Sequence, residues 1–170
     1  KFEYVYKFVS TQRFDATCPQ TNTDLLDEGT LYAARFDADG QGEWLPLVYH
    51  PDGPLNAASG FRNQAEVLIN ARSAADVLGA TMMDRPEDVE PNPTTGKVYI
   101  ACTRNESRSD HSLHGSYGHR EIDLGPNSAN PRGKNLWGHI IELTESNNDH
   151  TATTFSWEVL LMGGEATPES

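Results

Sequence analysis

Short runs of alternating apolar and polar residues open the chain, which is the pattern of β-strands with one buried face. Residues 4–10 alternate in this way, and residues 30–36 form a second strand-like run that is apolar and aromatic. The turn at 37–42 contains two aspartates and two glycines and joins the second run to a third at 43–49. This arrangement predicts antiparallel strands, with a β-hairpin formed by the second and third runs.

Residues 63–81 follow a different period. Their apolar side chains recur at spacings of three and four residues, with no proline and with glycine only at position 79. This period predicts helix, broken near residues 73 and 74 into two short helices. The apolar face is narrow, which is typical of a helix on the surface of another structure.

Four further strand-like runs follow, at residues 88–90, 97–103, 139–143 and 155–161. Turns separate the first pair and the last pair, and the long polar loop 104–138 separates the two pairs. A loop of this length in a compact domain is usually functional or disordered. The strand order is that of one four-stranded blade of a β-propeller, although a β-sandwich also consists of short strands and turns.

The sequence therefore predicts a mainly β fold: a partial β-propeller with one four-stranded antiparallel blade, parts of neighbouring blades and one or two surface helices. We expect residues 1–170 to be a fragment of a single propeller domain, with partial blades at 1–49, a helical insertion at 63–81 and a full blade at 84–162. Such a fragment cannot close a ring and exposes open sheet edges, so self-association through these edges is expected.

Charge narrows the range of partners. The chain has 25 acidic and 13 basic residues and a formal net charge of −12, so no nucleic-acid partner is expected. Acidic residues suit hard cations such as calcium, but they equally keep a protein soluble. No apolar run reaches the length of a membrane span. Two cysteines, Cys18 and Cys102, fit either one bridge or two buried thiols.

Two glutamates stand at corresponding strand entries. Glu87 follows Pro86, which fixes the approach to the run at 88–90, and Glu28 precedes the run at 30–36. In a propeller the first strand of each blade lines the central channel, so both carboxylates would face one opening. Converging carboxylates need a cation or a shared proton, which makes a metal site the functional hypothesis. Alternatively, each acid caps a turn or pairs with an arginine on the surface.

Arginines near these positions give a hypothesis for phosphate binding, because a guanidinium group matches two phosphate oxygens. Arg85 lies two residues before Glu87, and Arg132 lies in the long loop close to Asn130. A solvated basic loop is the alternative, since most arginines are exposed.

Three histidines of the long loop fall within nine residues, but their spacing fits no helical metal-binding signature and no cysteine is near. We expect a flexible surface loop there. Gly-x-Ser-x-Gly, Walker and Gly-x-Gly-x-x-Gly patterns do not occur, so the hydrolase, nucleoside-triphosphate and dinucleotide classes that use them have no support. The histidines are His111, His114 and His119.

Several stretches taken together resemble the PhoX alkaline phosphatases. They are Leu-Asp-Glu-Gly-Thr-Leu-Tyr-Ala-Ala-Arg-Phe at 26–36, Met-Asp-Arg-Pro-Glu-Asp-Val at 83–89, and Asn-Pro-Arg at 130–132 followed by Gly-His-Ile-Ile at 138–141. The closing Thr-Phe-Ser-Trp-Glu at 154–158 fits the same family. The stretches occur in order over nearly the whole chain, so the sequence is identified as a member of this family.

The resemblance implies a roughly six-bladed propeller from a bacterial, secreted phosphomonoesterase that depends on calcium and iron. It implies metal binding by Glu28 and Glu87, and phosphate or ligand-orienting contacts by Arg85, Asn130 and Arg132. The substrate would be a phosphomonoester and the location periplasmic or extracellular, although no signal peptide is visible in these residues.

One departure from the family concerns iron. The family has an iron-binding cysteine in an N-terminal Trp/Cys-Glu-Glu stretch, which these 170 residues lack, and Cys18 and Cys102 lie in other contexts. We therefore expect the chain to hold part of the metal cluster and to be inactive alone. A non-catalytic propeller module that binds a ligand or calcium, and a purely structural module, are the alternatives.

Overall fold

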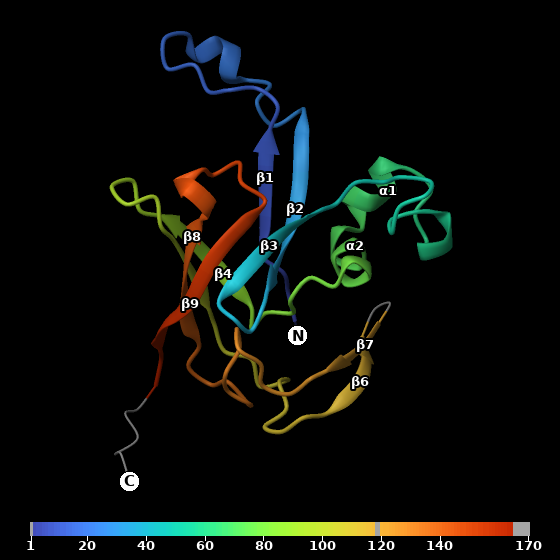
Figure 1. The fold of residues 1–170 in the computed structure, drawn as a ribbon, viewed down its shortest axis with the longest axis vertical. Coiled ribbons are helices and arrows are strands. Elements are labelled where there is room, and N and C mark those ends of the chain that lie inside the picture. Colours follow the sequence, from blue (N-terminus) through green and yellow to red (C-terminus); the bar gives the residue numbers. More distant parts are fainter. Residues whose placement is uncertain (1, 118–119, 165–170) are drawn as a thin grey trace.

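The structure is a computed structural model that describes residues 2–117 and 120–164. Strands dominate the described residues, and two short α-helices interrupt them (Figure 1). The strands are β1 (Tyr6–Ser10), β2 (Gly29–Phe36), β3 (Gln41–Pro46), β4 (Pro86–Pro91), β5 (Val98–Cys102), β6 (His114–Tyr117), β7 (Arg120–Asp123), β8 (His139–Glu145) and β9 (Thr154–Met162), and the helices are α1 (Gln64–Ile69) and α2 (Ala71–Leu78).

Seven strands form one curled antiparallel sheet in the order β1-β2-β3-β9-β8-β5-β4. The sheet has two halves, which meet where residues 41–43 of β3 pair with residues 154–156 of β9. One half, β4-β5-β8-β9, is the four-stranded antiparallel blade that the sequence predicts, and β1-β2-β3 is a partial blade. The predicted mainly β fold, a partial propeller with surface helices, is confirmed, while the proposed domain boundaries stay a prediction.

The long loop contains strand structure that the sequence did not predict. Within it, β6 and β7 pair as a separate two-stranded hairpin that His114 begins, and His111 and His114 are exposed on the surface, as expected. The physical reason for the hairpin is Asp123, whose carboxylate accepts hydrogen bonds from Leu113 N (2.8 Å) and Ser112 Oγ (2.6 Å). These bonds hold the pKa of Asp123 at about 2. His119 lies outside the described residues.

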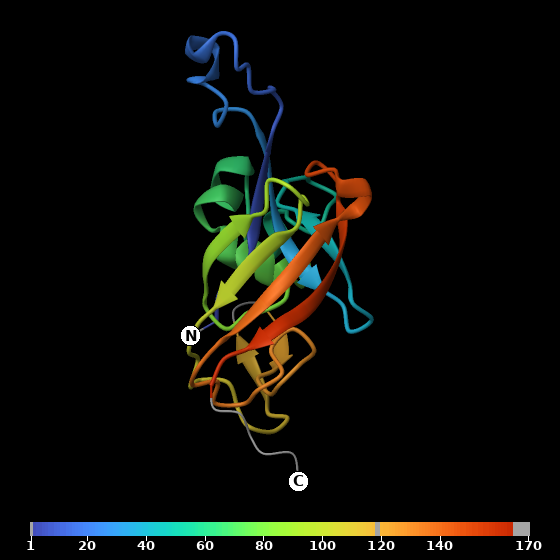
Figure 2. The ribbon, with the colours of Figure 1, turned by 90° about the vertical axis from the view of Figure 1, so that its left-hand side faces the viewer.

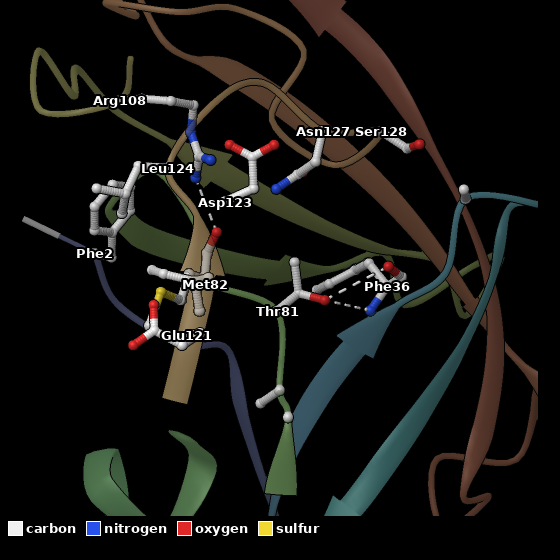
Figure 3. Close-up of a pocket in the computed structure, with 14 residues that line it drawn as sticks. Phe2, Phe36, Thr81, Met82, Arg108, Glu121, Asp123, Leu124, Asn127 and Ser128 are labelled. Carbon is white, nitrogen blue, oxygen red and sulfur yellow. Dashed lines mark hydrogen bonds between the residues drawn. The ribbon is translucent and has the colours of Figure 1, made fainter. Parts of the chain in front are cut away.

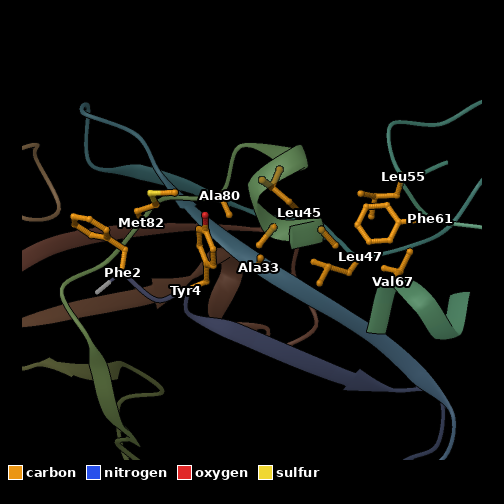
Figure 4. Packing of buried hydrophobic residues seen from close by; sticks show 12 residues of the cluster. Phe2, Tyr4, Ala33, Leu45, Leu47, Leu55, Phe61, Val67, Ala80 and Met82 are labelled. Carbon is orange, nitrogen blue, oxygen red and sulfur yellow. The ribbon is translucent and has the colours of Figure 1, made fainter. Parts of the chain in front are cut away.

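Two helices occupy the predicted helical segment, and the break lies at Asn70, a few residues before the predicted position. The Asn63 side chain caps α1 by accepting a hydrogen bond from Glu66 N (2.9 Å). Gly79, with φ of +78°, ends α2 in the left-handed conformation that glycine adopts without strain. Figure 4 shows the buried side chains between the helical segment and the strands β2 and β3, among them Ala33, Leu45, Leu47, Phe61 and Val67.

A second core fills the curl of the sheet, and aromatic rings dominate it. The Phe155 ring of β9 lies 5.3 Å from that of Phe36 and 5.1 Å from that of Trp44, measured between centroids. Phe36 and Trp44 belong to β2 and β3, so these rings join the two halves of the sheet where the backbone pairing is short. Side-chain packing therefore stabilises the junction in addition to the ladder.

A buried charged group reinforces this junction. Glu145 of β8 accepts hydrogen bonds from Lys7 Nζ (3.1 Å) and from Trp44 Nε1 (3.1 Å). Burial lowers the pKa of Lys7, and the bonds to Glu145 oppose that shift. The contact connects β1 and β3 of one half to β8 of the other.

Both cysteines are free: Cys18 is half-buried and Cys102 is buried. Of the two interpretations that the sequence left open, the structure shows unbridged thiols. Among the described residues, no helix has the length and apolar character needed to cross a membrane.

Replacing Phe155 by alanine is expected to lower the free energy of unfolding by about 3–5 kcal/mol, because it opens a cavity among the rings that join the two halves. Urea unfolding followed by tryptophan fluorescence measures the change. Leu160→Ala is the control, since Leu160 lies on the same strand and is 50% exposed. Equal losses for the two variants would show that the junction does not depend on this ring.

Candidate functional site

The turn that leads into β4 has an unusual backbone. Arg85 has φ of +48°, in the left-handed region that residues other than glycine seldom adopt. Its amide donates a hydrogen bond to Met83 O (3.0 Å), and its carbonyl accepts one from Thr103 N (3.0 Å). The backbone is therefore fixed on both sides, while the Arg85 side chain is exposed.

Glu87 occupies a β-bulge. Pro86 pairs with Cys102 and Asp88 pairs with Ala101, so Glu87 is the extra residue between two paired positions. A bulge redirects the side chain of the extra residue, and bulges are frequent beside active sites. The Glu87 carboxylate is exposed and accepts a hydrogen bond from Thr103 Oγ1 (3.3 Å). Together with Glu3, Pro86 and Arg85 it lines an open hollow at this end of the sheet.

Asn130 lies directly beneath the turn and is fully buried. Its Oδ1 accepts a hydrogen bond from Asp84 N (2.8 Å), and its Nδ2 donates to Met82 O (3.1 Å) and Asn127 Oδ1 (2.9 Å). The amide is thus engaged within the protein. This geometry gives Asn130 a supporting position under Arg85.

Arg132 lies at the same end of the blade, near the end of β9. Its guanidinium donates a hydrogen bond to Gly163 O and lies 5.9 Å from the centroid of the Trp137 ring. Arg85 and Arg132 flank opposite edges of the four-stranded blade, since β4 and β9 are its outer strands. The structure therefore brings Arg85, Glu87, Asn130 and Arg132 to one end of the blade.

Glu28 is not among them. It is exposed, and its carbonyl accepts a hydrogen bond from Thr11 N (3.0 Å), just beyond the end of β1. The opposite end of β1 is the one near Glu87, because Glu3 pairs with Met83. Residues 11–28 extend away from the body of the molecule there (Figure 1).

The reason for this separation is the direction of the strands. β2 and β4 are second and seventh in an antiparallel sheet, so they run in opposite directions and begin at opposite ends. In the structure, Glu28 and Glu87 do not face one opening. Across the described residues, moreover, no group of three histidine, cysteine or acidic side chains is arranged to hold a metal ion. Each glutamate can offer oxygen ligands, but the described residues do not assemble a complete metal site.

Sequence reasoning missed a set of buried polar residues behind the turn. Asp84, at 0% exposure, accepts hydrogen bonds from Arg108 Nε (2.7 Å), Asn105 Nδ2 (2.8 Å) and Asn135 Nδ2 (3.1 Å). Asp84 directly precedes Arg85 in the sequence, and this neighbouring position could have indicated a role for Asp84 near the site. Arg108 and Asn105 belong to the long polar loop, and no pattern distinguishes them from its exposed residues.

A cavity of about 370 Å³ lies on the other side of Arg108, between the β6–β7 hairpin and residues 79–82. Figure 3 shows Arg108 reaching toward Met82, with Asp123 and Asn127 beside it. The cavity lining includes neither Arg85 nor Glu87. We therefore place the candidate site at the Arg85 turn and treat this cavity as separate.

His139 completes the buried set. Its Nε2 lies 2.8 Å from the Ala129 carbonyl oxygen, which can only accept, so Nε2 carries the proton. Its Nδ1 then accepts from Asn135 Nδ2 at 3.2 Å. Burial lowers the pKa of His139 below its usual 6.5 because it disfavours the charged ring; the nearby Arg108 and Arg132 act in the same direction, while the Ala129 carbonyl and Asp84 oppose the shift.

The chain is similar in sequence and in fold to known proteins. A family model described as alkaline phosphatase PhoX matches residues 1–170. The chain is also similar to the solved structure of Pseudomonas fluorescens PhoX in complex with vanadate, a transition state analogue, with 44% identity and a TM-score of 0.77. The match covers 92% of this chain and 26% of that chain, so the chain spans about a quarter of that protein's length. No curated protein matches the chain.

The neutral state of His139 predicts a pH dependence of stability. The unfolded chain, in which this pKa is near 6.5, takes up the proton before the folded chain does as pH falls. The contribution of His139 is therefore complete above about pH 6.5 and declines below it. We expect Tm to drop between pH 7.5 and 5.5 by about 2–4 °C for each kcal/mol lost, and to drop less in His139→Gln. The exposed His111, replaced by glutamine, is the control; an equal pH dependence in all three proteins would contradict the assignment.

Proposed function

The chain belongs to the PhoX alkaline phosphatase family, and from this premise we propose that it forms part of a metal-dependent phosphatase that hydrolyses phosphomonoesters. The similarity to a phosphatase solved with vanadate carries the proposal, because vanadate imitates the phosphoryl group in its transition state. Since the chain spans about a quarter of that protein, it contributes a part of the active site, and the rest comes from residues elsewhere.

Arg85 is the group best suited to hold the phosphoryl oxygens. Its guanidinium is exposed and always charged, and its fork matches two oxygens of a phosphate. Arg85 has a left-handed backbone, and hydrogen bonds from its amide and to its carbonyl fix the position of its Cα atom. A fixed backbone lowers the entropy lost when the side chain is oriented toward a ligand. Arg132 supplies a second cation at the same end of the blade, and Asn130 supports the turn from beneath.

Glu87 repels a phosphate and therefore needs a cation between them. We propose calcium and iron as the ions of the complete enzyme, with Glu87 and Glu28 each providing carboxylate oxygens, the ligands that calcium prefers. Bound metal ions polarise phosphoryl oxygens. Burial raises the pKa of Cys102 to about 12, so its thiol is protonated at neutral pH in this structure.

The remaining proposals concern the surroundings of the enzyme. A phosphatase of this family would act in the periplasm or outside the cell. The edge strands β1 and β4 carry the partly exposed Tyr6, Phe8 and Val89, and open edges of this type pair with further strands. Other parts of a longer chain would cover them, and without those parts a second copy would associate there.

The 170-residue chain is expected to be inactive alone, because the described residues do not assemble a metal site. Release of p-nitrophenol from p-nitrophenyl phosphate, with calcium and iron added, should stay at background for this chain and be clear for the full-length protein that contains it. Turnover by the chain itself, lost in Glu87→Ala, would overturn the expectation of inactivity.

In that full-length protein, Glu87→Gln is expected to lower kcat/KM by about 100-fold or more, since it removes a charged oxygen ligand. Glu90→Gln is the matched control, because Glu90 is exposed on the same strand. Elemental analysis of both variants shows whether the loss of activity accompanies loss of metal. Full activity in Glu87→Gln would exclude Glu87 from the site.

A further inference from the structure

Arg108 is one of the largest side chains that the described structure buries completely, at 1% exposure, and its partner Asp84 is at 0%. Removing two charges from water is unfavourable, and apolar residues of similar size often stabilise a core at least as well. This pair therefore needs an explanation beyond stability. Its position offers one, because Asp84 immediately precedes Arg85.

The pair satisfies its polar atoms through the long loop. Arg108 donates from Nε to Asp84 Oδ1 (2.7 Å), from Nη1 to Gly125 O (2.9 Å) and from Nη2 to Met82 O (2.9 Å). The bonds to Met82 and Asp84 hold the strand entry from below, and the bond to Gly125 holds the far side of the loop. These bonds anchor the loop under the turn. Figure 2 shows the loop at one end of the blade.

Asp84 is held at its backbone as well as at its carboxylate. Asn105 and Asn135 donate to the carboxylate, and the Asp84 amide donates to Asn130 Oδ1 (2.8 Å). With both parts fixed, the peptide that follows has little freedom. The left-handed conformation of Arg85 is consistent with that restraint.

Lys134 provides independent support. Four residues other than glycine have positive φ in the described structure; two are asparagines, which tolerate it, and the others are Arg85 and Lys134. Lys134 N donates a hydrogen bond to Arg108 O (2.8 Å). The unfavourable backbone conformations at Arg85 and Lys134 are thus both adjacent to the Asp84–Arg108 pair.

We propose that Asp84 is a positioning residue: held by Arg108, Asn105 and Asn135, it sets the backbone of Arg85 and, through the bulge, the direction of Glu87. The proposal rests on the proposed function, since it concerns how the phosphate-binding arginine is oriented. Through Asp84, the part of the long loop around Arg108 and Asn105 then acts in the reaction indirectly, by orienting Arg85.

The test is Asp84→Asn in the full-length protein, which keeps the shape of the side chain and removes its charge. We expect KM for p-nitrophenyl phosphate and the inhibition constant of vanadate to rise by about 10–100-fold, the range for residues that orient a site. A merely structural role would reduce the active fraction and Tm but leave both constants unchanged. Glu145→Gln is the matched control, because Glu145 is a buried acid with two hydrogen-bonded partners in β1 and β3. It should lower Tm and leave both constants within twofold of the wild type.

Unchanged constants in Asp84→Asn would overturn the proposal. If that variant does not fold, Asn105→Ala decides, since it removes one hydrogen bond to Asp84 and retains the ion pair; a rise in both constants supports the proposal and unchanged constants reject it. Wild-type protein that neither hydrolyses the ester nor binds vanadate would refute the proposed function, and this inference with it. Active wild type with unchanged constants in the variants would refute the positioning role only.

Discussion

A charged pair withdrawn from water is stable only when its remaining donors and acceptors find partners, and Asp84 and Arg108 meet this condition through backbone carbonyls and asparagine side chains. The requirement constrains a large part of the chain. It draws the long loop under the blade, fixes the entry to β4 and leaves Arg85 at the surface in a conformation that arginine seldom adopts. The positions of the loop, the entry to β4 and the candidate site therefore all depend on this one buried ion pair.

The two halves of the sheet are held together by apolar packing. The two halves of the curled sheet share only a short ladder, so the rings of Phe36, Trp44 and Phe155 and the bond from Trp44 to Glu145 hold them together. This junction lies away from the Arg85 turn. The aromatic core thus stabilises the fold, while the polar cluster around Asp84 orients Arg85. Because the two regions are separate, a variant of Glu145 is a suitable control for a variant of Asp84.

Local patterns predicted the strands, the β2–β3 hairpin and the paired helices, because alternation and helical period depend on residues close in sequence. The direction of β2 relative to β4 depends on how many strands lie between them, so the sequence did not reveal that Glu28 and Glu87 lie apart. The β6–β7 hairpin depends on Asp123 binding residues across the turn rather than on an apolar face. Arg108 is buried against Asp84 and the carbonyls of Met82 and Gly125, which lie far away in the sequence or follow no recognisable pattern, so the polar loop does not indicate its burial.

The two ends of the sheet differ in a way that favours one of them as the reactive end. A bulge at Glu87, left-handed backbone at Arg85 and Lys134, and the fully buried Asp84–Arg108 ion pair all fall at the end where β4 begins. Each costs stability, and structures retain such costs mainly where function requires a fixed geometry. The end that carries Glu28 is a regular strand entry with an exposed acid. If the complete protein uses both glutamates, the Arg85 turn is where orientation matters, and Glu28 needs only to present its carboxylate to residues that lie elsewhere.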